Sequence, residues 1–204
     1  MSIGFPEKRV VMALPAESDG VFEAAGVPVL YCGVGKVNAA IALTQELCRY
    51  SNAGRPLPLV INFGTAGSPQ HATGTLTACH HFVQRDMDVR GLGFALGVTP
   101  FDATPAALLF EPVFQLTPAV CGSGDSFAMG SCEAQCTVLD MEAYALAKVC
   151  WLAHAGFACV KYITDGADHA AAADWQNNVH KAADAFLELY SSVQNPSGQA
   201  ILAS

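Results

Sequence analysis

The chain has 204 residues, of which 52% are hydrophobic and only 14% charged, and its formal net charge is −8. No stretch approaches the roughly 18–20 uninterrupted apolar residues of a membrane-spanning helix, and the acidic balance with scattered Lys and Arg argues against a nucleic-acid-binding surface. The length fits one large domain, predicted to cover 1–194, followed by a tail at 195–204.

The eight cysteines point to a reduced, cytoplasmic protein. Most of them lie in apolar runs, and no C-x-x-C pair occurs. Cys132 and Cys136 are not matched by a second pair of ligands, so a zinc site is disfavoured. Residues 1–9 carry no signal-peptide pattern. We therefore expect buried thiols in a cytoplasmic interior rather than a disulfide framework.

The first half of the chain alternates strand-like and helical patterns. Apolar runs at 9–14 and 27–32 predict two strands, and the spacing of apolar residues over 37–50 predicts a helix. A buried strand is predicted at 59–63, closed by a glycine turn at 64–67.

The second half continues this alternation. Residues 75–89 predict one or two strands, and the Gly- and Pro-rich stretch 90–118 is predicted to be irregular. A short strand is expected at 119–121, a helix opening at 139 and ending at 154, and a strand at 157–163.

One last helix is predicted after Asp174, which is a good N-cap. Its apolar face would consist of Trp175, Val179, Ala183, Phe186, Leu187 and Tyr190. Strands that alternate with helices indicate a single-domain α/β fold, with a mixed, twisted central sheet flanked by helices.

Acidic residues follow several of the predicted strands. Glu17, Glu142 and Asp165 each stand at the end of an otherwise apolar element. Ligands of α/β sheets bind beyond the carboxyl ends of strands, and partly desolvated carboxylates there suit acid or base catalysis. The alternative is that Glu17 and Asp165 only cap helices or turns.

The pair Gly33 and Gly35 precedes a predicted helix, where backbone N–H groups could hold an anion. The dinucleotide-binding pattern is incomplete, because Asn38 stands where its third glycine would be. A plain turn between strand and helix fits the sequence equally well.

Six motifs, in order, resemble those of one enzyme family, the 5'-methylthioadenosine/S-adenosylhomocysteine nucleosidases of the purine nucleoside phosphorylase/nucleosidase superfamily. Asp140 and Thr164 replace the family's Glu and Ser, which are mild changes. The similarity covers residues 9–190. The motifs are ALPAE at 13–17, GVGKVNAA at 33–40, GTAG at 64–67, SGDSF at 123–127, DMEA at 140–143 and TDGAD at 164–168.

The resemblance implies hydrolysis of the N-glycosidic bond of a 5'-substituted adenosine, with release of adenine and without a cofactor. Asp165 would donate a proton to purine N7, Glu17 would activate the attacking water, and Glu142 would bind the ribose. Phe127 would stack on the base, and Trp175 would cover the 5' substituent unless it is a core residue. The other implied binding residues are Thr65, Ala66, Gly67, Ala128 and Met141.

Three alternatives remain open at this level. A phosphorylase would need arginines for phosphate, and Arg85 and Arg90 are the candidates. A non-catalytic nucleoside-binding relative would not need all three carboxylates. A metal enzyme would use His80, His81 and His169, but adjacent residues of a strand point to opposite faces.

The stretch between Asp88 and Val120 is shorter than the family usually has and is predicted to lack one of its helices. The 5' substituent is therefore undecided among methylthioadenosine, S-adenosylhomocysteine, 5'-deoxyadenosine and futalosine-like compounds. The apolar composition and the resemblance favour a homodimer.

Overall fold

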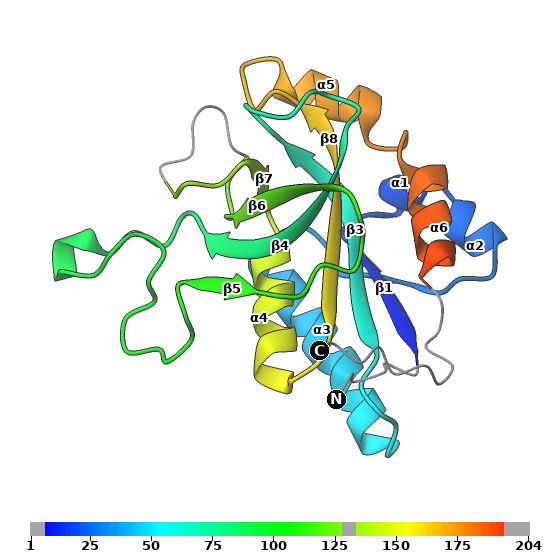
Figure 1. The fold of residues 1–204 in the computed structure, drawn as a ribbon, viewed down its shortest axis with the longest axis horizontal. Coiled ribbons are helices and arrows are strands. Elements are labelled where there is room, and N and C mark those ends of the chain that lie inside the picture. Colours follow the sequence, from blue (N-terminus) through cyan, green and yellow to red (C-terminus); the bar gives the residue numbers. More distant parts are fainter. Residues whose placement is uncertain (1–6, 128–133, 194–204) are drawn as a thin grey trace, which may run out of the picture.

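The computed structural model describes residues 7–127 and 134–193, which form a mixed α/β unit (Figure 1). The strands are β1 (Lys8–Met12), β2 (Val29–Tyr31), β3 (Leu59–Gly67), β4 (Leu76–Gln84), β5 (Ala107–Leu109), β6 (Thr117–Ser123), β7 (Val138–Asp140) and β8 (Phe157–Asp165). The helices are α1 (Pro15–Ser18), α2 (Val21–Ala24), α3 (Lys36–Asn52), the 3-10 turn η1 (Arg90–Leu92), α4 (Ala143–Ala153), α5 (Ala171–Asn178) and α6 (Ala183–Ser192).

The eight strands form one mixed sheet, in the order β2-β1-β3-β7-β6-β4-β5, and β8 bridges β3 and β4. The pairs β1–β3, β3–β8 and β6–β7 are parallel, whereas β4 runs antiparallel to β8. Since β3 also meets β7 at Gly67 and Leu139, the strands β3, β8, β4, β6 and β7 pair in a closed circuit. The predicted α/β fold with a mixed central sheet is confirmed.

Two hydrophobic cores lie on opposite faces of the sheet, because successive side chains of a strand alternate in direction. Val60 of β3 belongs to a core shared with α3 and α4, while its neighbours Leu59 and Ile61 belong to a second core with α2 and α6. In that second core Phe186 of α6 stacks on Phe63 of β3, with ring centroids 5.0 Å apart. Figure 1 shows α3 and α4 together on one side and α1, α2 and α6 on the other.

Two local predictions around the motifs were wrong. Residues 64–67 are not a turn but the end of β3, which pairs with β8 and carries a register shift between Ala66 and Gly67. The segment predicted to open a helix at Leu139 is instead strand β7, and α4 begins only at Ala143. In both places pairing within the sheet overrides the local pattern.

The last predicted helix is two helices. Asp174 is not an N-cap but lies within α5, whose N-cap is Ala170. The chain turns between the two helices because they pack on different elements, α5 on β8 and α6 on α2.

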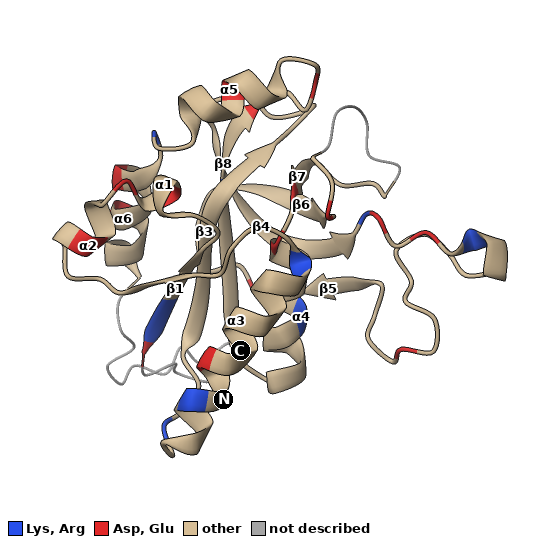
Figure 2. Cartoon of the chain, turned by 180° about the vertical axis from the view of Figure 1, so that it is seen from behind, with Lys and Arg blue, Asp and Glu red and all other residues tan. Residues whose placement is uncertain are grey.

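Between β4 and β6 the described chain contains only η1 and β5, without an α-helix, as the sequence suggested. This segment projects from the body as an arm (Figure 1). Lys and Arg are dispersed over the ribbon rather than gathered on one surface (Figure 2). None of the helices in the described ranges is long and apolar enough to cross a membrane.

The cysteines follow the sequence prediction except at Cys48, which is exposed, and at Cys136. Cys79, Cys121, Cys150 and Cys159 are free and buried in the core. Cys136, however, is disulfide-bonded, so the expectation of thiols alone was wrong at that position.

Candidate active site

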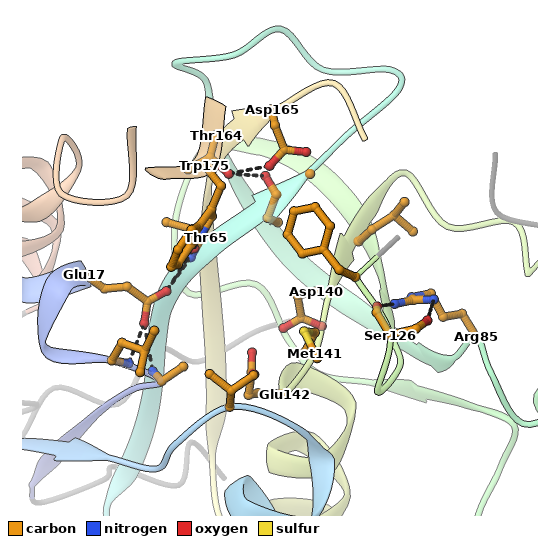
Figure 3. Close-up of a pocket in the computed structure, with 17 residues that line it drawn as sticks. Glu17, Thr65, Arg85, Ser126, Asp140, Met141, Glu142, Thr164, Asp165 and Trp175 are labelled. Carbon is orange, nitrogen blue, oxygen red and sulfur yellow. Dashed lines mark hydrogen bonds between the residues drawn. The ribbon is translucent and has the colours of Figure 1, made fainter. Parts of the chain in front are cut away.

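A cavity of about 210 Å³ opens where the carboxyl ends of β1, β3, β6, β7 and β8 approach one another. It is lined by nine of the ten predicted site residues, and the tenth, Ala128, lies outside the described residues. The nine are Glu17, Thr65, Ala66, Gly67, Phe127, Met141, Glu142, Asp165 and Trp175. Glu17, Glu142 and Asp165 reach this one cavity from three separate elements (Figure 3).

Glu17 is held by four hydrogen bonds although it is only 4% exposed. Its Oε2 accepts from the backbone N–H groups of Ala13 and Leu14, at 2.8 and 3.1 Å. Its Oε1 accepts from the N–H and the hydroxyl of Thr65, at 2.9 and 3.1 Å. The contact with Leu14 is the capping-box bond of α1, so the turn that starts this short helix also aims the carboxylate at the cavity.

The glycines of β3 do not form a turn; because they lack side chains, charged groups can lie close to the strand. A Cβ atom added at Gly64 would lie 3.0 Å from Nζ of Lys161 and 3.2 Å from Oε1 of Glu17. One at Gly67 would lie 2.5 Å from Oδ1 of Asp165, closer than atoms can approach. The missing side chains let three ionisable groups pack against one strand.

Glu142 occupies the anion position that the glycine loop could have offered to a ligand. The loop precedes α3, and Gly35, with a φ of +94° that favours glycine, is the N-cap of that helix. The N–H of Gly35 donates to Oε1 of Glu142 at 2.8 Å. The next N–H, that of Lys36, donates to Oδ1 of Asp125 at 2.8 Å. The N-terminus of α3 thus binds two carboxylates of the protein itself.

Burial raises the pKa of Glu142 to about 7, and the negative charges of Asp140 and Glu17 act in the same direction. The charge of Lys161 and the hydrogen bond from Gly35 oppose the rise without cancelling it. Glu142 therefore titrates near neutral pH, although a free glutamate would be ionised.

Replacing Glu142 by Gln is expected to stabilise the protein at pH 8. Ionised Glu142 is unfavourable in the fold, and a pKa raised from 4.5 to about 7 corresponds to about 3 kcal/mol. Because the folded pKa is the higher one, the stability from Glu142 is complete below pH 4.5 and is lost as the pH rises through 7. Urea unfolding from pH 4.5 to 8 should show the gain of the variant growing with pH.

The control for this comparison is Glu111→Gln, at an exposed position outside the cavity, which should leave the free energy of unfolding nearly unchanged. A gain from Glu142→Gln that is the same at every pH would contradict the raised pKa.

Lys161 supports the site through Asp140 and was missed by the sequence analysis. It is 1% exposed on β8, and its Nζ lies 2.8 Å from Oδ2 of Asp140. Asp140 also accepts from the Ser123 hydroxyl at 2.5 Å and from the N–H of Ala143 at 2.8 Å. Burial alone would raise the pKa of Asp140, but Lys161 and these donors lower it. A lysine within an apolar strand was the available signal.

Asp165 ends β8 and is 3% exposed. Its Oδ1 accepts from the N–H of Ala167 at 2.9 Å, and its Oδ2 accepts from the Thr164 hydroxyl at 2.7 Å. That hydroxyl also lies 3.3 Å from the carbonyl of Ala66, which is a second acceptor for its proton. The Thr164 hydroxyl can therefore turn to suit either protonation state of Asp165.

The charged side chains of Arg85 and Asp86 hydrogen-bond to the turn before Phe127. Arg85 lines the cavity and donates from Nη1 to the Ser126 hydroxyl at 3.2 Å (Figure 3). Its Nη2 donates to the carbonyl of Gly124 at 3.3 Å. Asp86 accepts from the N–H of Asp125 at 2.8 Å. These bonds join the end of β4 to the turn that positions Phe127.

His80 and His81 do not point to opposite faces of β4 as adjacent residues of a regular strand would. A register shift between Cys79 and His81 interrupts β4 where it pairs with β6, and the rings of His80 and His81 lie 5.0 Å apart. The expectation that they point to opposite faces was therefore wrong. Even so, no group of three or more His, Cys, Asp or Glu side chains that could hold a metal occurs within 7–127 and 134–193.

Comparison with known proteins gives a consistent result. Residues 20–194 match the family model of the phosphorylase superfamily. The chain is 32% identical to a 5'-methylthioadenosine/S-adenosylhomocysteine nucleosidase of Marinomonas over 168 residues, 72% of this chain and 71% of that protein.

Two solved structures share the fold at 20% identity. The nucleosidase of Neisseria meningitidis, in complex with methylthio-immucillin-A, has a TM-score of 0.79 over 93% of this chain and 99% of that chain. Futalosine hydrolase of Helicobacter pylori has a TM-score of 0.78 over 92% and 97%. The chain therefore belongs to the phosphorylase superfamily and, within it, to the 5'-methylthioadenosine/S-adenosylhomocysteine nucleosidase family of hydrolases.

Proposed function

We propose that this enzyme hydrolyses the N-glycosidic bond of a 5'-substituted adenosine of the methylthioadenosine or S-adenosylhomocysteine type and releases adenine. The observation that carries the proposal is the convergence of Glu17, Glu142 and Asp165 on one cavity, each less than a tenth exposed. The family relationship supports the same reaction.

Asp165 is the general acid in this proposal. Departure of the purine is difficult because the base leaves as an anion unless it is protonated. Asp165 would donate a proton to N7, and the mobile Thr164 hydroxyl then stabilises the carboxylate that remains. Phe127, on the cavity wall, would stack on the base.

Glu17 and Glu142 act on the ribose and the attacking water in this proposal. Glu17 would accept a proton from the water that attacks C1', and Glu142 would accept hydrogen bonds from the ribose hydroxyls. Both negative charges also favour the positive charge that develops on the ribose ring. With a pKa of about 7, Glu142 reaches its ionised form at and above neutral pH.

An apolar part of the cavity fits the 5' substituent. Leu14 and Val34 line the wall next to Glu17 and Glu142, and Trp175 and Met141 complete it. These side chains suit a thioether better than a free hydroxyl, which would lack a partner there.

Hydrolysis is favoured over phosphorolysis because the N–H groups at the N-terminus of α3 are already hydrogen-bonded. Its first N–H groups are taken by Glu142 and Asp125, so this helix does not offer them to phosphate. Arg85, one of the two arginines considered for phosphate, does line the cavity, but its guanidinium binds Ser126 and Gly124. The other, Arg90, pairs with Asp88 on the arm. Glu17 would moreover repel a phosphate nucleophile.

The deciding experiment follows release of free base from methylthioadenosine by the purified protein, with and without phosphate. Adenine formed at equal rates in both conditions, with free methylthioribose, is expected. Dependence on phosphate, with a sugar 1-phosphate product, would establish a phosphorylase instead. Absence of any free base from methylthioadenosine, S-adenosylhomocysteine, 5'-deoxyadenosine and futalosine would leave a binding protein.

We also propose that the enzyme acts as a homodimer. Val34 lies in the loop just before α3, and Val37 and Ile41 lie one turn apart at the start of that helix; the three are 42%, 68% and 52% exposed. An apolar stripe of this kind is typical of a covered surface. Sedimentation equilibrium is expected to give the mass of two chains, and the mass of a single chain would rule the dimer out.

A further inference from the structure

The indole of Trp175 is joined to Glu17 through one hydroxyl group. Nε1 of Trp175 donates to Oγ1 of Thr65 at 3.1 Å, and Oγ1 of Thr65 donates to Oε1 of Glu17 at 3.1 Å. Figure 3 shows the indole, the hydroxyl and the carboxylate in sequence along one wall of the cavity. The three residues come from α5, β3 and α1.

The direction of this chain follows from the chemistry of its members. An indole N–H can only donate, a carboxylate can only accept, and a hydroxyl carries one proton. When Thr65 accepts from Trp175, its own proton remains free to point at Glu17. Trp175 therefore fixes the rotation of the Thr65 hydroxyl.

That hydroxyl differs from the other three donors to Glu17. The N–H groups of Ala13, Leu14 and Thr65 belong to the backbone and are fixed by the fold. A carboxylate has about four acceptor positions, and four donors occupy them here. Of these donors only the Thr65 hydroxyl can rotate, so its direction, and with it the part of Oε1 left open to a water, depends on the hydrogen bond from Trp175.

We propose that Trp175 is a positioning residue for Glu17, acting through Thr65, so that the placement of α5 sets the direction of the hydroxyl that hydrogen-bonds to the general base. This inference rests on the proposed function. The helix is anchored independently, because Nδ2 of Asn178 donates to the carbonyl of Thr164 at 2.8 Å beside Asp165. Substitution of the indole nitrogen thus tests the hydrogen-bond chain without removing the helix from its strand.

The test compares Trp175→Phe with the wild type in steady-state adenine release. Phenylalanine keeps an aromatic wall and removes only the donor. The expected result is a kcat about three- to tenfold lower, the effect of one neutral hydrogen bond, with KM changed less than twofold. Trp151→Phe, on the far end of α4 and outside the cavity, is the matched control and should keep the wild-type kcat.

A double-mutant cycle separates a positioning role of Trp175 from a change in how the side chain at that position packs against the substrate. In a Thr65→Val background the hydroxyl is gone, and Trp175→Phe should no longer lower kcat. In a Thr65→Ser background the hydroxyl remains, and the same substitution should lower kcat as before. Thermal unfolding of each variant confirms that it is folded.

A kcat of Trp175→Phe equal to that of the wild type, a change confined to KM, or full additivity with Thr65→Val would each overturn the inference. Wild-type protein that releases no base would contradict the proposed function itself, which keeps the two failures distinct.

Discussion

Asp165→Asn is expected to lower kcat for adenine release about 10²- to 10⁴-fold, the contribution of a positioned general acid. The amide cannot give up a proton to the departing base. It can still accept from the N–H of Ala167 and face the Thr164 hydroxyl, which can turn towards the carbonyl of Ala66. The fold should therefore persist, and KM should change only a few-fold. Chromatographic measurement of adenine at saturating substrate checks this.

The control for that comparison is Asp168→Asn. Asp168 is exposed, three residues further along the same loop, and does not line the cavity. It should keep kcat within about threefold of the wild type, since its carboxylate only caps the N–H of Ala170. Equal losses in both variants would assign the effect to the loop rather than to a proton donor.

Lys161→Met is expected to destabilise the protein by about 3–5 kcal/mol, because it leaves a buried carboxylate without its counter-ion. The side chains of Lys161 and Asp140 are 2% and 1% exposed, so water cannot replace the lost partner. Urea unfolding at pH 7 measures the loss as a lower midpoint.

The second variant of this series, Lys161→Met with Asp140→Asn, should recover most of the stability. The neutral amide still has an oxygen for the Ser123 hydroxyl or the N–H of Ala143. A loss below about 1 kcal/mol in the single variant, or additive losses in the double variant, would contradict a tightly coupled pair.

Asp140, which stands where the family motif has Glu, has a defined structural role here. Asp140 joins the Ser123 end of β6, the start of α4 and Lys161 of β8. Next to it, Met141 and Glu142 line the cavity. One residue of the DMEA motif thus holds the site together, while its neighbours form the wall.

The amino-acid sequence by itself determined the α/β fold, most strands, the two longest helices α3 and α4, the family, and the set of carboxylates at the cavity. Local periodicity and the residues that follow each strand contain this information. Glu17, Glu142 and Asp165 could be found because each ends an apolar run within an ordered motif.

Only the tertiary structure decided which groups face one another. The pairing of Lys161 with Asp140, the N–H of Gly35 on Glu142 and the indole of Trp175 on Thr65 join residues more than 20 positions apart. The same applies to residues 64–67, where pairing with β8 turned a predicted turn into a strand. The last predicted helix divided because α5 and α6 pack on different elements. Hydrogen bonds and ion pairs of this kind depend on distances in space, which local periodicity does not encode.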